Sequence, residues 1–501
     1  MTLLLIPGLP LLAALLSGAA MLRPKRPRAR ASERVLAGMT IVSSVLVLLL
    51  ASKMAWRVAA GATFTALSGW VSVDALGALI ILLIALVGTT SAIYSWGYMA
   101  RSYTEPGRLR LYYANYNLFI FSMLAIPMVN EPTLVWIFVE LTTVSSALLV
   151  SFENTEAALE AAWKYVALSL MGAGIALLGF LLLFSTLQAA GGESYTWQGL
   201  QHVAARMPPA LLTTSFVLIL VGLGTKVGFV PLHTWLPDAH SQAPSPVCAL
   251  LSGIETTSVL YVILRLLPIV DSASTPGMRR WVIGFGLLSA GTAAFLLLQV
   301  RDYKRLFAFS TVEHMGIILV AAGLAGEAAH FAAVYQILAH TVTKSFCFFA
   351  AGAALLTVKT RDISSVRGLI GASPIAAIAL LLGALAIAGA PPLPLFMSEF
   401  AILRAGLASG RYLTVALLAL FIVIAFFGIL LHVNRMVFGS PKPGNHEPAT
   451  QPATAPAAIM PLPHTCIAVL IAGGALMIAL GLVLPSPLRE LLRLAAAGLR
   501  R

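Results

Sequence analysis

The chain of 501 residues is 59% hydrophobic and only 10% charged, and its mean hydropathy is +0.92. Soluble domains carry roughly 25% charged residues, so the composition excludes a protein whose surface faces mainly water and predicts one that lies in a lipid bilayer. The formal charge of +13 does not indicate a nucleic-acid partner, because the basic residues stand in short clusters between apolar runs, as in the loops that orient a membrane protein.

The first apolar run, residues 1–21, is followed by a basic cluster of Arg23, Lys25, Arg26, Arg28, Arg30 and Arg34. A secretory signal carries its positive charge before the apolar stretch, so we interpret this run as a retained first helix. A helix needs about 20 apolar residues to span a bilayer. Suitable runs centre near residues 12, 43, 85, 120, 142, 174, 218, 258, 290, 316, 342, 383, 422 and 474. The sequence therefore predicts an all-α polytopic membrane protein with about fourteen transmembrane helices.

The orientation follows from the distribution of lysine and arginine. With both termini outside, the inward loops hold 18 of the 32 basic residues, and the outward loops and tail hold 12. The inward set includes Lys164, Arg301, Lys304 and Arg305, and the remaining two basic residues, Lys226 and Lys344, fall inside helices. Cytoplasmic loops are enriched in basic residues. We therefore expect a multi-pass protein of the cell membrane with both termini on the outer side.

Two apolar runs are interrupted by glycine and proline, at residues 222–233 and 388–399. Proline removes a helix hydrogen bond and clashes with the preceding turn, and non-helical backbone within a membrane is tolerated only where protein or water surrounds it. Five helices separate the two interruptions, which predicts two five-helix repeats with broken helices 7 and 12, a pattern typical of transporters. The expected units are helices 1–3 in 1–105, the first repeat (helices 4–8) in 106–270, the second repeat (helices 9–13) in 271–438, a Pro/Ala-rich loop in 439–461, and helix 14 with a tail in 462–501.

Ionisable side chains lie within several predicted helices, where each charge costs at least ~2.5–3.5 kcal/mol. They are Glu140, Lys226, Glu255, Glu313, His314, His340, Lys344 and Glu399. The alternative for each is a place near a helix end, where the side chain reaches water, or a structural hydrogen bond; it weighs most for Glu313 and Glu399, which border polar or irregular sequence. Carboxylates, lysines and histidines at similar depth predict a proton relay, because burial and nearby charges tune such groups to titrate near neutral pH.

Cofactor chemistry has little support in the sequence. Cys248, Cys347 and Cys466 are far apart, and no C-x-x-C pair is present to hold an iron–sulfur cluster or a structural zinc. Gly172 and Gly174 lie inside an apolar run instead of following a strand, which favours helix packing over nucleotide binding. We expect this chain to hold no metal and no redox cofactor.

From about Tyr94 to Phe438 the chain resembles the proton-translocating, antiporter-like subunits of respiratory complex I and its relatives. The most specific stretch is GTKVGFVPLHTWLPDAHSQAPSP at 224–246, and it is supported by YSWGYM at 94–99, EAAWKY at 160–165, KRLFAFS at 304–310 and SEF at 398–400. Within this family, EAAWKY and APSPVCALLS at 243–252 are most similar to component F of hydrogenase-4, a membrane subunit of group 4 NiFe-hydrogenase and formate hydrogenlyase complexes.

The resemblance implies fourteen helices with inverted repeats at helices 4–8 and 9–13, and it implies roles for single residues. Glu140 would pair with Lys226, the proton carrier of helix 7. His314, His340 and Lys344 would belong to the central axis, Glu399 would be the glutamate on the exit side, and Lys164 falls where some relatives carry a helix 6 lysine. Further candidate residues are His233, Asp238, Glu255, Thr257 and Glu313.

One position departs from the pattern of the family. Relatives in complex I place a lysine in helix 8, where the alignment puts Thr257. Glu255 is two residues away, about 200° round a regular helix, so it does not simply replace that lysine. Water or His314 would bridge the gap, and the completeness of the relay is open. Hydrogenase-type relatives also tend to lack this lysine, which favours that assignment.

We therefore expect a proton-translocating membrane subunit of an energy-converting hydrogenase or formate hydrogenlyase-type oxidoreductase complex. Its partners would be other membrane subunits and a hydrophilic, hydrogenase-like redox arm that carries out the electron transfer. The alternatives are a subunit of complex I, a multisubunit cation/proton antiporter, the membrane partner of a zinc protein in inorganic-carbon uptake, and a scaffold in which the motif residues only pack.

Overall fold

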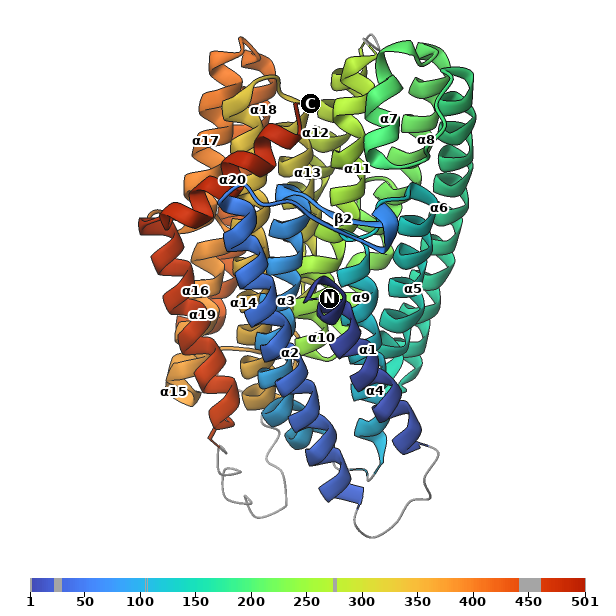
Figure 1. The fold of residues 1–501 in the computed structure, drawn as a ribbon. Coiled ribbons are helices and arrows are strands. Elements are labelled where there is room, and N and C mark those ends of the chain that lie inside the picture. The colour runs from blue at the N-terminus through green and yellow to red at the C-terminus, as the bar shows by residue number, and fades with distance from the viewer. Residues whose placement is uncertain are drawn as a thin grey trace, which may run out of the picture.

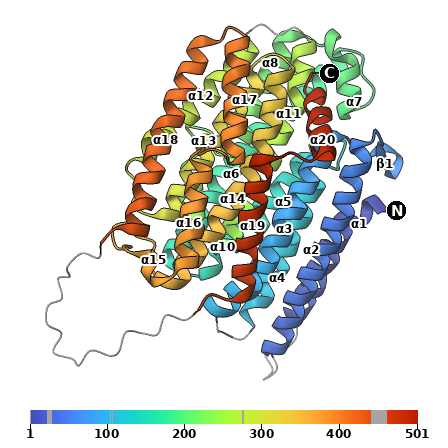
Figure 2. The ribbon, with the colours of Figure 1, turned by 90° about the vertical axis from the view of Figure 1, so that its left-hand side faces the viewer.

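The computed structural model describes residues 2–21, 29–103, 105, 107–273, 277–440 and 461–500. Its elements are nearly all helices, and most of them stand side by side in one upright bundle (Figures 1 and 2). The first three long helices are α1 (Thr2–Met21), α2 (Ala29–Ala59) and α3 (Ala75–Ser102). Between α2 and α3 a short antiparallel hairpin joins β1 (Phe64–Ala66) to β2 (Val71–Val73).

The part of the chain predicted as the first repeat begins with α4 and ends with a helix that has an irregular turn. Its helices are α4 (Arg108–Ala125), α5 (Pro132–Val150), α6 (Glu156–Ala189), the short α7 (Trp197–Val203), α8 (Pro209–Val227), α9 (Trp235–Gln242), α10 (Ser245–Leu250) and α11 (Thr256–Ser272). A π-helical turn at Leu251–Glu255 connects α10 and α11, so that residues 245–272 form one continuous span. The carboxylate of Glu131 caps α5 by accepting hydrogen bonds from the amides of Thr133 and Leu134.

The second part of the bundle follows the same all-helical pattern. Its helices are α12 (Met278–Leu297), α13 (Tyr303–Gly323), α14 (Glu327–Val358), α15 (Leu369–Ala372), α16 (Pro374–Ile387), α17 (Pro394–Ala408) and α18 (Tyr412–Phe438). Two more helices, α19 (His464–Leu482) and α20 (Ser486–Gly498), follow. Short 3₁₀ turns lie at Leu67–Gly69, Ser151–Glu153 and Ala204–Arg206.

The all-α membrane fold predicted from the sequence is confirmed, and so are both interruptions. A described helix covers each of the predicted centres, and α8 and α9 are separated at 228–234, as are α16 and α17 at 388–393. Twelve helices of the described residues are long and apolar enough to span a membrane. They do not include α4, nor α16 and α17, which have only 14 and 15 residues because the break divides their span. The count of fourteen and the inverted repeats stay predictions.

The two ends of the bundle differ. The start of α1 lies about halfway up the bundle and α20 lies in its upper half, whereas the end of α1, the start of α2 and the start of α19 lie towards the lower end (Figure 2). That both termini lie on the outer side of the membrane stays a prediction. The loop predicted at 439–461 falls almost entirely outside the described residues, as do Arg23, Lys25, Arg26 and Arg28 of the basic cluster.

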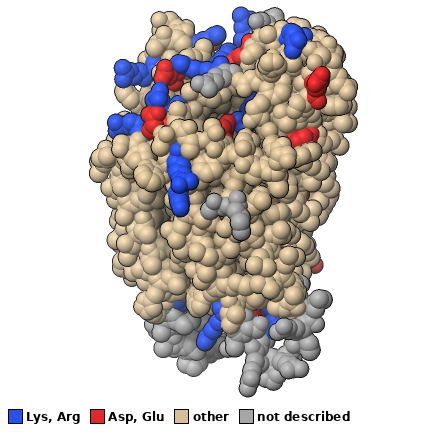
Figure 3. Space-filling model, in the orientation of Figure 1, with Lys and Arg blue, Asp and Glu red and all other residues tan. Residues whose placement is uncertain are grey.

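The outer surface is apolar over most of its height. On the face seen in Figure 3, side chains that are neither acidic nor basic form a broad band, and charged groups gather mostly towards one end. Large apolar side chains point outwards, among them Leu15, Trp163 and Ile471, each more than half exposed. Because water does not favour such a surface, the band is suited to contact with lipid tails.

Candidate functional site

The ionisable residues that the sequence analysis places inside helices are buried in this structure, with one exception. Lys226, Glu255, Glu313, His314, His340, Lys344 and Glu399 are all nearly inaccessible, and Glu140 is half-buried. They come from six long helices, α5, α8, α11 with its π turn, α13, α14 and α17. An unpaired charge or donor is costly at such depth, so the contacts of each group indicate what it can do.

Lys226 lies in the last turn of α8, where Gly228 ends the helix with a φ of +93°. Its ammonium Nζ donates to Thr143 Oγ1 at 2.6 Å and to the Tyr165 hydroxyl at 2.9 Å. It also forms an ion pair with Glu255 Oε1 at 3.1 Å. An ammonium has three N–H donors, and here each of them has an acceptor, so a protonated Lys226 is fully satisfied.

Glu255 is held by hydroxyl groups as well as by the lysine. Tyr165 donates to its Oε1 at 3.0 Å, and Ser146 Oγ lies 3.4 Å from the same oxygen. The second oxygen, Oε2, has no hydrogen-bond partner among the described residues. The carboxylate is therefore anchored on one side and open to a proton on the other.

The π turn at Leu251–Glu255 sets which helix 8 residue faces Lys226. A π turn holds roughly one residue more than an α turn, and each extra residue rotates the remainder of the helix by about 100°. In the structure Glu255 reaches Lys226, whereas Thr257 Oγ1 contacts only the Gly253 carbonyl of its own helix, at 3.4 Å.

The expected ion pair between Glu140 and Lys226 is not formed in this structure. The carboxylate within ion-pair distance of Lys226 in the described part of the chain is that of Glu255. Glu140 lies within electrostatic reach of both Lys226 and Glu255, and its Oε2 has no hydrogen-bond partner in the described residues. Two carboxyl groups therefore face one ammonium.

A second group of polar side chains surrounds His314 at the break between α16 and α17. His314 Nε2 contacts the carbonyl of Ile387 at 3.0 Å, and Gln336 Nε2 contacts His314 Nδ1 at 3.2 Å. Ser398 donates to Gln336 Oε1 at 2.5 Å, which leaves the amide of Gln336 to donate to the histidine. This pattern fits a neutral imidazole with its proton on Nε2. Glu399 Oε1 stands 3.6 Å from Nδ1.

His340 links this second group to the π turn. Its ring centroid lies 5.5 Å from that of His314, and its Nε2 contacts the Ser252 carbonyl at 3.2 Å. The hydroxyl of Ser252 is 2.6 Å from that of Thr311. Since Ser252 belongs to the turn that ends at Glu255, the histidines and the Lys226 group meet at the same irregular segment.

Lys344 is held by neutral groups. Its Nζ donates to the Phe307 carbonyl at 2.8 Å and to Ser310 Oγ at 2.6 Å. Glu313 is buried on the same helix as Ser310, and its Oε2 has no hydrogen-bond partner among the described residues. Glu313 lies within electrostatic reach of both Lys344 and Glu399. These three groups are therefore arranged to exchange charge without a fixed pair.

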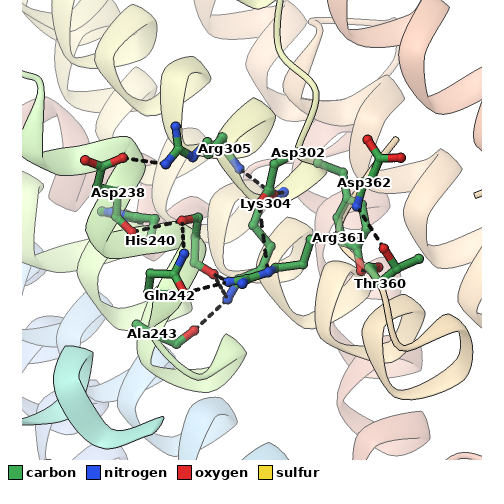
Figure 4. A network of polar contacts seen from close by, with 12 residues as sticks. Asp238, His240, Gln242, Ala243, Asp302, Lys304, Arg305, Thr360, Arg361 and Asp362 are labelled. Atoms are coloured by element: carbon green, nitrogen blue, oxygen red, sulfur yellow. Dashed lines mark hydrogen bonds and ion pairs between the residues drawn. The ribbon is translucent and has the colours of Figure 1, made fainter. Parts of the chain in front are cut away.

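Asp238 and Lys164 lie apart from the buried groups. Asp238 accepts from Arg305 Nη2 at 2.6 Å (Figure 4). Lys164 lies 3.5 Å from the same aspartate and 2.5 Å from Glu160, with 40% of its side chain exposed. His233 is buried in the break after α8, and its Nδ1 has no hydrogen-bond partner in the described part of the chain.

Lys304, which we counted among the loop charges, is instead almost completely buried. Its Nζ donates to the carbonyls of Ser241 and Ala243, at 3.0 and 2.6 Å, at the end of α9 (Figure 4). Arg361 donates to the same Ser241 carbonyl. Cations are favoured at the negative end of a helix dipole, so this contact ties α13 to the second half of the broken helix.

The same network includes a partly exposed acidic loop residue (Figure 4). Asp362 accepts hydrogen bonds from the hydroxyls of Ser364 and Ser365, each at 2.5 Å. These bonds hold the pKa of the Asp362 carboxyl below its ordinary value, so it stays charged beside Arg361.

Sequence reasoning missed the neutral partners of the charged groups. These are Thr143, Ser146 and Tyr165 around Lys226, and Gln336 and Ser398 around His314. A signal existed for Gln336, because it stands four residues before His340 and eight before Lys344, on the same helix face. In the described residues no three His, Cys, Asp or Glu side chains gather as metal ligands would.

Comparison with known proteins identifies the family. The family described as NADH:quinone oxidoreductase/Mrp antiporter, TM, matches residues 130–426. The hydrogenase-4 component F homolog of Methylacidiphilum infernorum is 37% identical over 385 residues, which are 75% of this chain and 80% of that protein. Hydrogenase-4 component B of Escherichia coli is 32% identical over 65% of this chain and 49% of that protein. The Na(+)/H(+) antiporter subunit A1 of Staphylococcus aureus is 31% identical over 65% of this chain and 41% of that protein.

Solved structures have the same fold. A chain of the membrane-bound sulfane sulfur reductase, an archaeal respiratory membrane complex, superposes with a TM-score of 0.84 at 22% identity, covering 99% of this chain and 97% of that one. A chain of the Mrp complex from Dietzia sp. gives 0.82 at 20% identity, covering 100% and 97%. A chain of respiratory complex I from Thermus thermophilus gives 0.73 at 21% identity, covering 96% and 97%. The chain therefore belongs to the NADH:quinone oxidoreductase/Mrp antiporter transmembrane family, the proton-translocating, antiporter-like membrane subunits.

Proposed function

We propose that this chain carries protons across the cell membrane as a subunit of an energy-converting hydrogenase or formate hydrogenlyase-type complex. The observation that carries the proposal is one succession of buried titratable groups. It runs from Glu140 and the Lys226–Glu255 pair at 3.1 Å, along the π turn whose Ser252 carbonyl contacts His340, to His314 and Glu399, which lie 3.6 Å apart. Lys344 and Glu313 flank it. Waters can bridge the remaining gaps between such groups.

The chemistry of this succession is that of proton transfer. A buried lysine keeps its proton while a carboxylate faces it and releases the proton when that carboxylate moves away or is neutralised. A neutral histidine accepts a proton on one ring nitrogen and donates from the other. Lys226 would therefore load a proton near α8, and His340 and His314 would pass it towards Glu399, which lies beside the break between α16 and α17.

The assignment to a hydrogenase-type complex rests on sequence similarity. The match to the component F homolog covers most of both chains, at 37% identity, and the matches to component B and to the antiporter subunit cover less than half of those proteins. The partners would be other membrane subunits and a hydrophilic, hydrogenase-like redox arm. A cation/proton antiporter is the second candidate, supported by the 31% identity to the Staphylococcus aureus subunit.

Isolation of the intact complex through an affinity tag on this chain tests the assignment. We expect a nickel-containing hydrogenase-like subunit to co-purify, and we expect inverted membrane vesicles to acidify when that subunit turns over. Co-purification of other antiporter subunits without a redox partner, together with cation-driven proton movement, would decide for the second candidate. Co-purification of a carbonic-anhydrase-like zinc protein would contradict both.

A further inference from the structure

Among the described residues, the carboxyl groups of Glu140 and Glu255 lie near the ammonium of Lys226 at the end of α8. The ammonium of Lys226 is paired with Glu255, and Glu140 lies within electrostatic reach of both. If both acids were ionised, the cluster would carry a net negative charge in a medium where an uncompensated charge is very costly. The balanced arrangement therefore has one carboxylate, one ammonium and one carboxyl group that keeps its proton.

We propose that Glu255 is a second, alternating partner of Lys226, and that one carboxyl proton moves between Glu140 and Glu255 whenever the lysine changes partner. The proposal rests on the proposed function and deepens it, because it gives helix 8 of this chain an acid two residues before Thr257, the position at which complex I relatives carry a lysine. The structure then represents the state in which Lys226 pairs with Glu255 and Glu140 is neutral.

The exchange balances in protons and charge. When the ammonium moves from Glu255 to Glu140, the O–H bond of Glu140 breaks and an O–H bond forms on Glu255. The cluster holds one ammonium, one carboxylate and one neutral carboxyl group before and after the move. No oxidant, reductant or further reactant takes part.

The hydroxyl groups around Lys226 provide the path for this exchange. Thr143, which binds the ammonium at 2.6 Å, stands three residues after Glu140 on the same face of α5. The hydroxyls of Ser146 and Tyr165 lie 2.8 Å apart, and both reach Glu255 Oε1. Each hydroxyl both donates and accepts, so a proton can pass along them while the lysine moves only a short way.

A proton that arrives on Glu255 can move onwards towards His340 through bridging water. Its free oxygen, Oε2, has no partner among the described residues. The π turn that Glu255 ends also contains Ser252, whose carbonyl contacts His340 at 3.2 Å. Such turns occur frequently at functional sites in helices. Glu255 therefore stands between the Lys226 group and the two histidines.

The alternative is that Glu255 is only a fixed structural partner of Lys226, and infrared spectroscopy of the assembled complex separates the two accounts. The experiment uses Glu255→Gln, with Glu140→Gln to assign the carbonyl band of the protonated Glu140 carboxyl. In Glu255→Gln the acid left near Lys226, among the residues that the structure describes, is Glu140, so Glu140 becomes ionised and its band disappears although the residue is unchanged. A Glu140 band that persists in Glu255→Gln would overturn the proposal.

Proton transport by the same complexes provides the second readout. We expect Glu255→Gln to reduce transport per redox turnover to the level seen with an uncoupler, and Glu255→Asp, which keeps an acid, to restore part of it. The control is Glu33→Gln, a buried glutamate of α2 that accepts from the amides of Gly107 and Leu109; it should leave transport and the band unchanged. If the complex with Glu255→Gln does not assemble, the Glu255→Asp variant provides the test. Proton transport by Glu255→Asp as low as that of the uncoupled complex would contradict the proposal.

Failure of this inference can be distinguished from failure of the proposed function. Suppose that Glu255→Gln transports protons as the wild type does and Lys226→Ala does not. Glu255 would then not belong to the proton pathway, while Lys226 would still be its proton carrier. Wild-type proton transport by both variants would contradict the proposed function itself.

Discussion

At the scale of single residues, the account depends on how an ammonium is kept inside a protein. Lys226 has three acceptors, and two of them, Thr143 and Tyr165, are neutral hydroxyls. Neutral acceptors stabilise the ammonium without binding it to one acid. Close ion pairs with both carboxylates would instead fix the position of the ammonium. Lys344 is likewise held by a carbonyl and a hydroxyl. Neutral acceptors therefore bind both lysines, and Lys226 has the ion pair with Glu255 in addition.

Glu140→Gln tests the residue that the family resemblance singles out. Removing this carboxylate leaves Glu255 as the single acid near Lys226, so the lysine has no alternative partner and releases its proton less readily. We expect lower proton transport per redox turnover and an altered pH dependence of transport in inverted vesicles. Glu156→Gln, at an exposed position at the start of α6, should behave as wild type. An unchanged pH dependence in Glu140→Gln would contradict this role.

At the scale of elements, close helix contacts set the positions of the charged groups. α6, which carries Tyr165, packs on α8, which carries Lys226, through glycines without side chains. A Cβ atom on Gly172 would lie 2.6 Å from the carbonyl oxygen of Gly222, whereas one on Gly174 would meet nothing within 4 Å. Of the two glycines assigned to helix packing from the sequence, Gly172 is thus confirmed in that role and Gly174 is not.

This pair of glycines provides a matched test on one helix. Gly172→Ala forces α6 and α8 apart, and overpacking of this kind costs typically ~1–3 kcal/mol. We expect a lower melting temperature of the purified complex and weaker proton transport, because the Tyr165–Lys226 contact lengthens. Gly174→Ala should leave both at wild-type values. Equal melting temperatures for the two variants would show that the close contact does not support the site.

At the scale of the whole molecule, apolar runs and interruptions could be predicted from the sequence because each depends on local composition. The helices at all the predicted centres and the breaks after α8 and α16 follow from this. The partner of Lys226 could not be predicted, because it depends on the π turn at Leu251–Glu255. No residue type in that segment indicates a π turn. The hydroxyl and amide partners were missed for a similar reason, since such side chains are common in helices and only their neighbours give them a role.

The same limit applies to Lys304. Its place in a basic stretch after an apolar run is typical of a loop charge, yet the end of α9 provides two carbonyl acceptors for its ammonium. The fold brings these segments together from about sixty residues apart, and no local pattern encodes that meeting. A count of basic residues therefore predicts well which loops carry charge. It predicts less well whether a given charged side chain is exposed to solvent.

The most direct test of the central claim is proton transport by Lys226→Ala in inverted vesicles that contain the intact complex. We expect transport coupled to redox turnover to be abolished while the redox activity of the partner subunits is partly retained. Lys53→Ala, at an exposed position of α2, should transport protons as the wild type does. Wild-type transport by Lys226→Ala would contradict the account, because Lys226 would then not be needed to carry the proton.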